Sequence, residues 1–297
     1  MSTVVAFATC TRLGSHPDVD GSVLGPALRR HGIEPVFAAW DGPFAWPDAT
    51  LCVVKACWDY YLRPDEFVAW AEATALAVPI LNDAAVLRWN AHKSYLCRLA
   101  AAGVPVAPTL LVTGGPAAAA RAWATQPWPD VVLKPAVSVG ALRTERFAAG
   151  DPAGLAFLAA LLATGDALIQ PFLPSILDDG ETSLVYFDGS FSHAVRKQVV
   201  PGGFAAQPHL GGQVDRCTPD AAQLAVAAAA LAGTPGGVPP LFARVDLVGW
   251  GGSPVVMEVE LIEPALFLDL YESAADRMAG CIAARIGRDA ARRAAIE

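Results

Sequence analysis

The sequence is poor in charge and lacks a long hydrophobic run free of charged residues. Only 17% of its 297 residues are Asp, Glu, Lys or Arg, while 54% are hydrophobic. Because a membrane-spanning helix needs about 18 or more consecutive apolar residues, we expect neither a transmembrane segment nor a membrane partner. The first residues, MSTVVAFATCTRLG, have no basic stretch before their apolar run. A secretory signal has one, so we expect a cytoplasmic protein.

Positive charge is scarcer than negative charge, which bounds the possible partners. The chain has 21 Lys and Arg against 29 Asp and Glu, a net charge of −8. Contacts to nucleic-acid phosphates need a basic face, so we expect no nucleic-acid partner. The six cysteines form no C-x-x-C pair, and without a secretion signal they are expected to be reduced thiols. The sequence does not indicate an oligomeric state.

The hydrophobic pattern changes twice along the chain and predicts three units. Residues 1–88 alternate short apolar strands with helices, which is typical of a parallel sheet covered on both faces. Residues 89–168 resemble a small α+β subdomain, entered through a helix expected over 83–103. Residues 169–297 contain two antiparallel strand pairs and a long last helix. The expected fold class is therefore α/β and α+β, with a mixed or antiparallel third sheet.

The apolar stretch PVVMEVELIEPA, residues 254–265, carries three glutamates. On a strand, Glu258 and Glu260 point to the same face, opposite Met257, Val259 and Leu261. Two ionised carboxylates on one buried face would repel each other and cost several kcal/mol each in desolvation. A shared divalent cation would remove both problems. A solvent-facing polar edge is the alternative.

The segment RVD, residues 244–246, adds a third carboxylate. If its strand pairs with the glutamate strand through the turn at residues 249–254, Asp246 lies near Glu258. Three hard oxygen donors suit Mg²⁺ that is also bound by substrate phosphates and waters. Arg244 would supply positive charge beside them. A structural Arg–Asp ion pair is the alternative.

Two lysines could provide an anion site. Lys134 lies inside the apolar strand VVLKPAV, where a buried ammonium needs an anionic partner. The small-residue turn SVGA that follows can direct backbone N–H groups at a phosphate. Lys93 lies in the segment WNAHKSYL. The alternatives are a lysine extending from a strand edge and a solvated helical lysine.

Five segments occur in the order found in the ATP-grasp ligases, and the layout resembles that of glutathione synthetase. They are HKSYL, VVLKPAVSVGA, LIQPFLPSILDDGETSLVYFDG, ARVDLV and VVMEVELIEPA, between about Lys93 and Pro264. The resemblance implies an ATP- and Mg²⁺-dependent ligase. Residues 1–88 would be the pre-ATP-grasp domain, 89–168 the central lid subdomain and 169–297 the C-terminal ATP-grasp domain.

The same resemblance implies roles for individual residues. The ATP phosphates would be held by Lys93 and Lys134, under a lid turn containing Ser138 and Gly140. The hinge and adenine slot would be Gln170, Pro171, Phe172 and Leu173, and Glu181 would bind the ribose hydroxyls. Two Mg²⁺ ions would be bound by Asp246, Glu258 and Glu260, with Arg244 steadying the transferred phosphoryl group.

Two positions depart from the family pattern. Glu260 stands where relatives usually have Asn, and Ala205 stands where many relatives have Arg. The extra negative charge of Glu260 suits two cations and leaves the coordination open. The loss of the arginine leaves Arg196 and Lys197 as the nearest candidate catalytic cations.

Four fragments are similar to a narrower branch, the O-ureido-D-serine cyclo-ligases. They are CWDYY, VLRWNAHKSYL, GETSLVYFDGSFSHAVRK and EVELIEPALFLDL. The resemblance implies that a small amino-acid substrate is activated at its carboxylate and cyclised to D-cycloserine in antibiotic biosynthesis. Trp58, Asp59 and Tyr60 would line the substrate side, and Glu263 would be a substrate contact or a more distant partner of the metal site. Ordinary aromatic packing is the alternative for the first three.

Three other functions fit the same motifs. The protein could join two separate substrates, could be a kinase on the same fold, or could be a non-catalytic ATP-binding regulator. The Asp246, Glu258 and Glu260 set, together with Arg244, favours an enzyme over a regulator, because a nucleotide sensor does not need them.

Overall fold

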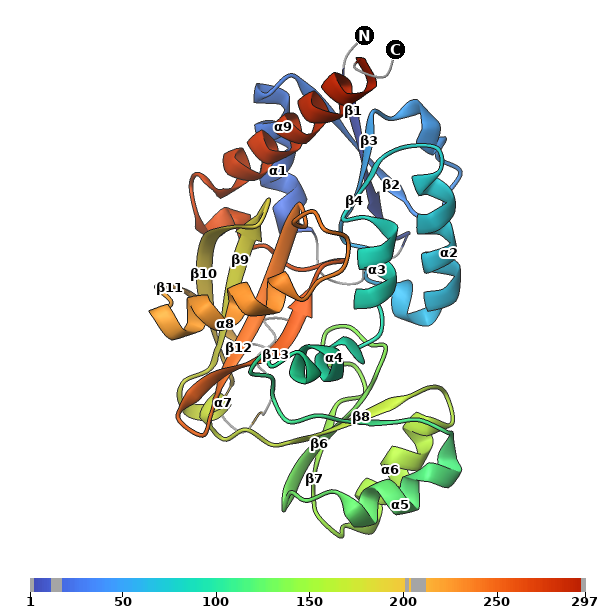
Figure 1. Ribbon diagram of the computed structural model, residues 1–297, viewed down its shortest axis with the longest axis vertical. Coiled ribbons are helices and arrows are strands. Elements are labelled where there is room, and N and C mark those ends of the chain that lie inside the picture. Colours follow the sequence, from blue (N-terminus) through green and yellow to red (C-terminus); the bar gives the residue numbers. More distant parts are fainter. Residues whose placement is uncertain (1–2, 12–17, 201–202, 204–211, 295–297) are drawn as a thin grey trace.

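The computed structural model describes residues 3–11, 18–200, 203 and 212–294. In this part of the chain the strands form three sheets, each with its own helices (Figure 1). The first sheet is parallel and the other two are antiparallel. The expected mixture of α/β and α+β units is therefore confirmed.

The first unit is a four-stranded parallel sheet in the order β2-β1-β3-β4. Its strands are β1 (Thr3–Thr9), β2 (Ile33–Ala39), β3 (Leu51–Val54) and β4 (Ile80–Leu81), and its helices are α1 (Val19–Arg30) and α2 (Pro64–Ala75). Alternate residues of β1 enter two different cores: Val5 and Phe7 pack beside α1, while Ala6 and Ala8 pack beside α2. The last helix of the chain, α9 (Ala274–Ala294), lies along α1 (Figure 1).

The helix predicted over residues 83–103 is two helices, α3 (Ala84–Asn90) and α4 (Tyr95–Ala101). Asp83 caps α3 by accepting a 2.8 Å hydrogen bond from the Val86 N–H. Between the helices, the Lys93 N–H donates to the Ala136 carbonyl at 2.7 Å instead of to a carbonyl one turn back. The prediction of one continuous helix was wrong because this long-range bond interrupts it.

The second unit is an antiparallel sheet in the order β5-β8-β6-β7. It contains β5 (Leu110–Val112), β6 (Asp130–Pro135), β7 (Glu145–Ala148) and β8 (Ala167–Pro171), with α5 (Ala119–Thr125) and α6 (Pro152–Leu162). Both helices lie on one face, over a core that includes Val131, Leu133 and Ile169 (Figure 1). The boundary expected between residues 168 and 169 falls inside β8, so we place it after this strand.

The third unit is a five-stranded antiparallel sheet in the order β11-β10-β9-β12-β13. It comprises β9 (Glu181–Phe187), β10 (Ser190–Gln198), β11 (Gln213–Cys217), β12 (Phe242–Trp250) and β13 (Ser253–Glu260), with α7 (Ser175–Asp178) and α8 (Ala221–Ala232). The two predicted hairpins, β9–β10 and β12–β13, are confirmed. The sequence pattern predicts that the last helix begins at Phe267, but it begins at Ala274, because Phe267 adopts a left-handed conformation (φ 53°) before a short turn over Leu268–Leu270.

The two faces of this third sheet differ in chemistry. Leu184, Val245 and Val259 point to one face and form a core with α4 and α8. The neighbouring residues point to the other face, where polar and ionised side chains are buried. This polar face lies opposite the lysines of the second unit, as the contacts below show.

Candidate active site

The strand pair β12–β13 brings together an arginine and three carboxylates. Asp246 lies opposite Glu258, and Arg244 lies opposite Glu260, so the predicted pairing is confirmed. The register shifts after Asp246, which leaves Met257 as the extra residue of a β-bulge. Met257 was predicted to share a face with Val259 and Leu261. Because of the bulge it packs instead in the cluster around Phe172.

Arg244 is the buried centre of this face, with only 6% of its surface exposed. Its Nε and Nη2 donate to the two oxygens of Asp246, each at 2.9 Å. Nη2 also contacts Glu260, and Nη1 donates to the Ala265 carbonyl at 3.0 Å. A guanidinium gripped on three sides presents its charge in a fixed position.

Lys197 joins Asp246 to a further carboxylate. The Lys197 Nζ lies 3.2 Å from Asp246 Oδ2 and forms an ion pair with Glu181, and all three groups are buried. The Ser183 hydroxyl donates to Asp246 Oδ1 at 2.6 Å. The neighbouring Arg244 and Lys197 hold the pKa of Asp246 below its usual range despite its burial. Glu181 is thus occupied by Lys197, and its predicted contact with a ribose stays a prediction.

The two phosphate-binding candidates lie beside Glu258. The Lys93 Nζ is 3.0 Å from Glu258 Oε1 and donates to the Ser138 carbonyl at 2.6 Å. Lys134 is 8% exposed, and burial lowers the pKa of its ammonium while Glu258 opposes that shift. The lid turn carries positive φ angles at Gly140 (58°) and at the residue after it. A buried ammonium without an ion-pair partner among the described carboxylates is suited to an anion such as a phosphate.

The acidic side of the site carries more negative charge than its protein partners neutralise. Burial raises the pKa of Glu260 to about 7, although Arg244 opposes the shift. Burial raises the pKa of Glu263 well above its usual range, and Glu260 and Glu258 add to the shift. Carboxylates whose ionisation is opposed in this way are stabilised by a cation.

The donor set fits magnesium held jointly with substrate phosphates. Among the described residues, Glu258 and Glu260 are each engaged through one oxygen only, and their side chains are 25% and 23% exposed. Mg²⁺ is typically bound by one or two carboxylates plus phosphates and water. Asp246 differs, because both of its oxygens are held by Arg244, Lys197 and Ser183. No preformed group of three metal-binding side chains occurs in the described ranges.

The four residues predicted to form the hinge are the last two of β8 and the two that follow it, and all four are buried. The Gln170 amide donates to the Thr109 hydroxyl at 2.9 Å, which fixes its side chain toward β5. Phe172 and Leu173 belong to an apolar cluster with Met257 beside Pro171. The Arg146 guanidinium lies 3.5 Å from the centre of the Phe172 ring. The structure therefore brings together an apolar wall at the predicted adenine position.

One predicted catalytic cation does not reach the site. Arg196 alternates with Lys197 along β10, so it points to the face covered by α8 and is exposed. Because neighbouring residues of a strand point to opposite faces, only one of the two can enter the cluster. The prediction for Arg196 was wrong for that reason. Ala205, noted for its departure from the family, lies outside the described residues.

The predicted substrate residues follow β3 in the first unit. The Trp58 indole N–H donates to the Glu263 carbonyl at 3.1 Å, which joins this segment to the end of the glutamate strand. Tyr60 is 3% exposed, and burial raises the pKa of its phenol well above the usual range, with smaller contributions from Glu263 and Glu258. Asp59 instead accepts a 2.8 Å hydrogen bond from the Trp40 indole. Trp58 and Tyr60 thus adjoin the site, while Asp59 serves local structure.

Sequence reasoning missed the residues that fix the glutamate strand from behind. Asn90 donates to the Val259 carbonyl at 2.7 Å and accepts from the Leu261 N–H at 2.8 Å. The Tyr95 hydroxyl accepts from the Val259 N–H at 3.0 Å. These contacts cover the edge of β13 on both sides of Glu260. Only the adjacency of both residues to Lys93 could have indicated them.

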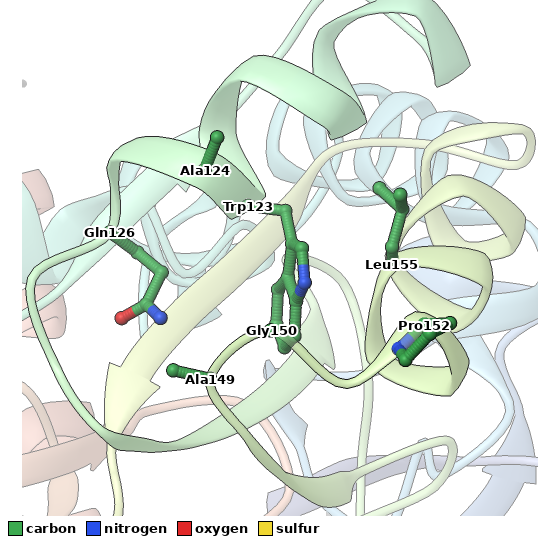
Figure 2. A pocket seen from close by; sticks show the side chains of 7 residues that line it. All are labelled: Trp123, Ala124, Gln126, Ala149, Gly150, Pro152 and Leu155. Carbon is green, nitrogen blue, oxygen red and sulfur yellow. The ribbon is translucent and has the colours of Figure 1, made fainter.

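A separate groove of about 440 Å³ lies in the second unit, away from this cluster. It is lined mostly by small and apolar residues around the Trp123 ring, and Figure 2 shows that ring standing between the two helices. The lining residues are Trp123, Ala124, Gln126, Ala149, Gly150, Pro152 and Leu155. None of them can act as an acid, a base or a metal ligand, so we do not place chemistry there.

Several solved structures share the fold of this chain. A RimK-domain ATP-grasp protein from Sphaerobacter thermophilus matches with a TM-score of 0.65 and 21% identity over 95% of this chain and 99% of that one. D-alanine–D-alanine ligase from Bacillus anthracis, complexed with ATP, matches with a TM-score of 0.66 and 14% identity over 97% and 99%. These likenesses show that the fold is that of the ATP-grasp ligases.

The relationship to one ligase is much closer. The chain is 36% identical over 284 residues to the cycloserine biosynthesis protein DcsG of Streptomyces lavendulae. The matched region covers 91% of this chain and 94% of that protein. The crystal structure of D-cycloserine synthetase DcsG matches with a TM-score of 0.86 and 34% identity over 95% and 99%. Residues 5–82 also match the family model of the DcsG N-terminal domain. The chain belongs to the DcsG family.

No described helix has the length and apolar character of a membrane span.

The raised pKa of Glu260 predicts how stability depends on pH when divalent cations are removed. Its value is about 7 in the folded chain against 4.5 in the unfolded chain. The folded state therefore binds this proton more tightly, and the free energy of unfolding should decrease as pH rises from about 4.5 to 7, by up to ~3 kcal/mol. Urea unfolding in EDTA should show that Glu260→Gln flattens this part of the profile. The exposed Glu34→Gln should not. Parallel wild-type and Glu260→Gln profiles would contradict the assignment.

Proposed function

We propose that the protein uses ATP and Mg²⁺ to cyclise O-ureido-D-serine to D-cycloserine in antibiotic biosynthesis. The observation that carries the proposal is the cluster in which three lysines (Lys93, Lys134, Lys197), Arg244 and four carboxylates (Glu181, Asp246, Glu258, Glu260) meet. A second support is membership of the DcsG family, whose named member takes part in cycloserine biosynthesis. The substrate would be a small amino acid held between the first and third units.

The first step is a phosphoryl transfer to the substrate carboxylate. A carboxylate oxygen forms a bond to the γ-phosphorus, the bond from that phosphorus to the ADP oxygen breaks, and an acyl phosphate results. Lys93 and Lys134 would hold the phosphates, and Arg244 would steady the transferred group. Glu258 and Glu260, and Asp246 after a rearrangement, would hold two Mg²⁺ ions. The ions would neutralise charge on the phosphate oxygens. Such a reaction depends mainly on positioning and charge neutralisation.

The second step is ring closure. The nitrogen bonded to the side-chain oxygen attacks the acyl carbon, the phosphate leaves with its electron pair, and the nitrogen loses its proton. Water then attacks the carbamoyl carbon, the bond from that carbon to the ring nitrogen breaks, and the nitrogen takes up a proton. The carbamoyl group leaves as carbamate, which decomposes to CO₂ and ammonia, and D-cycloserine remains. Because nucleophile and acyl carbon belong to one molecule, holding the substrate in a folded conformation is enough to make closure fast. Glu263, beside Trp58 and Tyr60, is the group we propose to contact the substrate.

The product decides between this function and its alternatives. The protein would be incubated with O-ureido-D-serine, ATP and Mg²⁺, with ADP measured by a coupled assay and products by mass spectrometry. D-cycloserine together with ADP would support the proposal. ADP release only when a second amine is added, with a coupled product, would indicate an intermolecular ligase. A stable phosphorylated product would indicate a kinase, and ATP binding without ADP release a regulator.

Replacing Lys134 with methionine should weaken ATP binding about 10- to 100-fold, or roughly 1.5–3 kcal/mol. Lys134 is buried, and methionine is an unbranched, flexible side chain without a charge to bury, so the fold should persist. Isothermal titration calorimetry would measure the affinity. Arg121→Met, which removes an exposed cation from helix α5 of the same unit, should leave the affinity unchanged. Unchanged affinity in Lys134→Met would exclude a phosphate contact for this residue.

A further inference from the structure

The loop that follows the glutamate strand is held to Arg244 through its own backbone. The Arg244 Nη1 donates to the Ala265 carbonyl at 3.0 Å, and the guanidinium lies 5.8 Å from the centre of the Phe267 ring in the same loop. The His193 Nε2 lies 2.7 Å from the carbonyl oxygen of the next residue, Leu266. Phe267 then adopts φ 53° and ψ 40°, a conformation that a non-glycine residue keeps only when its surroundings impose it.

The group that imposes this conformation comes from the first unit. Asp20, in the first turn of α1, is 4% exposed. Its Oδ2 accepts from the Leu266 N–H at 2.6 Å, and its Oδ1 accepts from the Leu268 N–H at 2.9 Å. One carboxylate therefore clamps the two N–H groups on either side of Phe267.

Lys55 completes this clamp. It follows β3, is 1% exposed, and its Nζ lies 3.2 Å from Asp20 Oδ2. The same Nζ donates to the Pro264 carbonyl at 3.2 Å and pairs with Asp18 at 3.3 Å. A buried carboxylate that is charged, paired and fully hydrogen-bonded is a rigid anchor. Lys55 and Asp20 together thus hold residues 264–268 from the side opposite Arg244.

We propose that Asp20 is a positioning residue for phosphoryl transfer, acting through the 264–268 loop on the orientation of Arg244. The inference rests on the proposed role of Arg244 in the ligase reaction. It adds that the first unit, on the substrate side, sets the geometry of the arginine on the phosphate side. Without the clamp, Ala265 would no longer hold its carbonyl on Nη1, and the guanidinium would keep only its carboxylate contacts.

The first variant is Asp20→Asn, which keeps the size of the side chain but turns one acceptor into an N–H₂ group facing a loop N–H. We expect kcat for ADP formation to fall about 10-fold or more, with the Kd for ATP changed less than about 3-fold. Backbone hydrogen exchange of peptides covering 264–270 should become faster. Lys55→Met should give the same pattern and carries the test if Asp20→Asn does not fold.

Asp276→Asn is the matched control. Asp276 of α9 pairs with Arg30 of the same helix α1 at 2.8 Å, but at the surface and without contact to the loop. This variant should change neither kcat nor loop exchange. A loss of kcat in Asp276→Asn equal to that in Asp20→Asn would mean that both variants merely loosen the packing of α1, and would overturn the proposal.

A double-variant cycle tests whether Asp20 acts through Arg244. If it does, the double variant should have a kcat less than about 2-fold below that of Arg244→Lys alone, although Asp20→Asn lowers the wild-type kcat about 10-fold or more. A full additional loss, or an unchanged kcat in Asp20→Asn alone, would overturn the proposal, as would unchanged exchange in the loop. If the wild-type protein forms no ADP with O-ureido-D-serine, the substrate proposal fails. The exchange arm still decides whether Asp20 holds the loop.

Discussion

Replacing Glu258 with glutamine should lower ADP formation by about 10²-fold or more, which corresponds to a barrier increase of roughly 2.7 kcal/mol. Glu258 lies opposite Asp246 in the hairpin and points into the cluster that contains Lys93 and Lys134, the two candidate phosphate-binding lysines. Glutamine keeps the size of the side chain but removes the charge that Mg²⁺ requires. A coupled assay for ADP at saturating ATP and Mg²⁺ would measure the loss.

The same substitution should also lower stability, because it separates a buried ion pair. Lys93 and Glu258 have side-chain exposures of 7% and 25%, and Lys93 would keep only its bond to the Ser138 carbonyl. Breaking a fully buried pair costs about 3–5 kcal/mol, and the partial exposure of Glu258 should reduce that cost. Activity must therefore be compared well below the unfolding temperature, which thermal denaturation would establish for each variant.

Glu72→Gln provides the control for Glu258→Gln. Glu72 pairs with Arg88 on the exposed surface between α2 and α3, so its substitution has the same chemistry outside the cluster. It should leave ADP formation unchanged. Near-normal turnover in Glu258→Gln would show that this carboxylate is only the structural partner of Lys93.

Replacing Arg244 with lysine should lower kcat by about 10²- to 10³-fold, the usual cost of losing one preorganised donor to a developing anion. Lysine keeps the positive charge between Asp246 and Glu260, but it cannot reproduce the paired donors of the guanidinium. Alanine would leave Glu260 without its ion-pair partner and Asp246 with Lys197 as its remaining cation, so a loss of activity in that variant could reflect unfolding. Steady-state kinetics and ATP calorimetry on the lysine variant would separate catalysis from binding, which should change little.

Arg29→Lys is the matched control for Arg244→Lys. Arg29 also grips a carboxylate with Nε and Nη2, that of Glu34, but on the exposed surface of the first unit. Its replacement should have no effect on kcat. If Arg244→Lys retained more than about a third of wild-type kcat, Arg244 would be a structural partner of Asp246 and not a catalytic residue.

Contacts within one hairpin were predictable from the sequence. The turn between β12 and β13 fixes the register near it, and that register alone would place Asp246 opposite Met257. The pairing of the two strands was therefore predictable, while the position of Asp246 opposite Glu258 also depends on the bulge. The bulge at Met257 did not follow, because nothing in the local pattern requires it. The choice between Arg196 and Lys197 was equally open, since it depends on which face of β10 meets the cluster.

Contacts between distant segments were beyond sequence reasoning. The break between α3 and α4 arises from a bond between Lys93 and Ala136, and local helix propensity continues through it. From the sequence alone, Asp20 is an acidic residue in the first turn of a helix, and Lys55 is a residue at the end of a strand. Their partners lie more than 200 residues away in the 264–268 loop, so only the packed structure joins them.

The short connector between α3 and α4 has a consequence for chain engineering. Surface connections usually tolerate inserted residues, yet the backbone N–H of Lys93 is fixed to Ala136 and its side chain to Ser138 and Glu258. One residue more or fewer here would move the ammonium away from partners in two other units. The exposed turn at Gly251 and Gly252 carries no comparable tether to a distant segment. A tag, a fluorophore or new chain ends therefore belong at that turn, while the length of the 91–94 connector has to be kept.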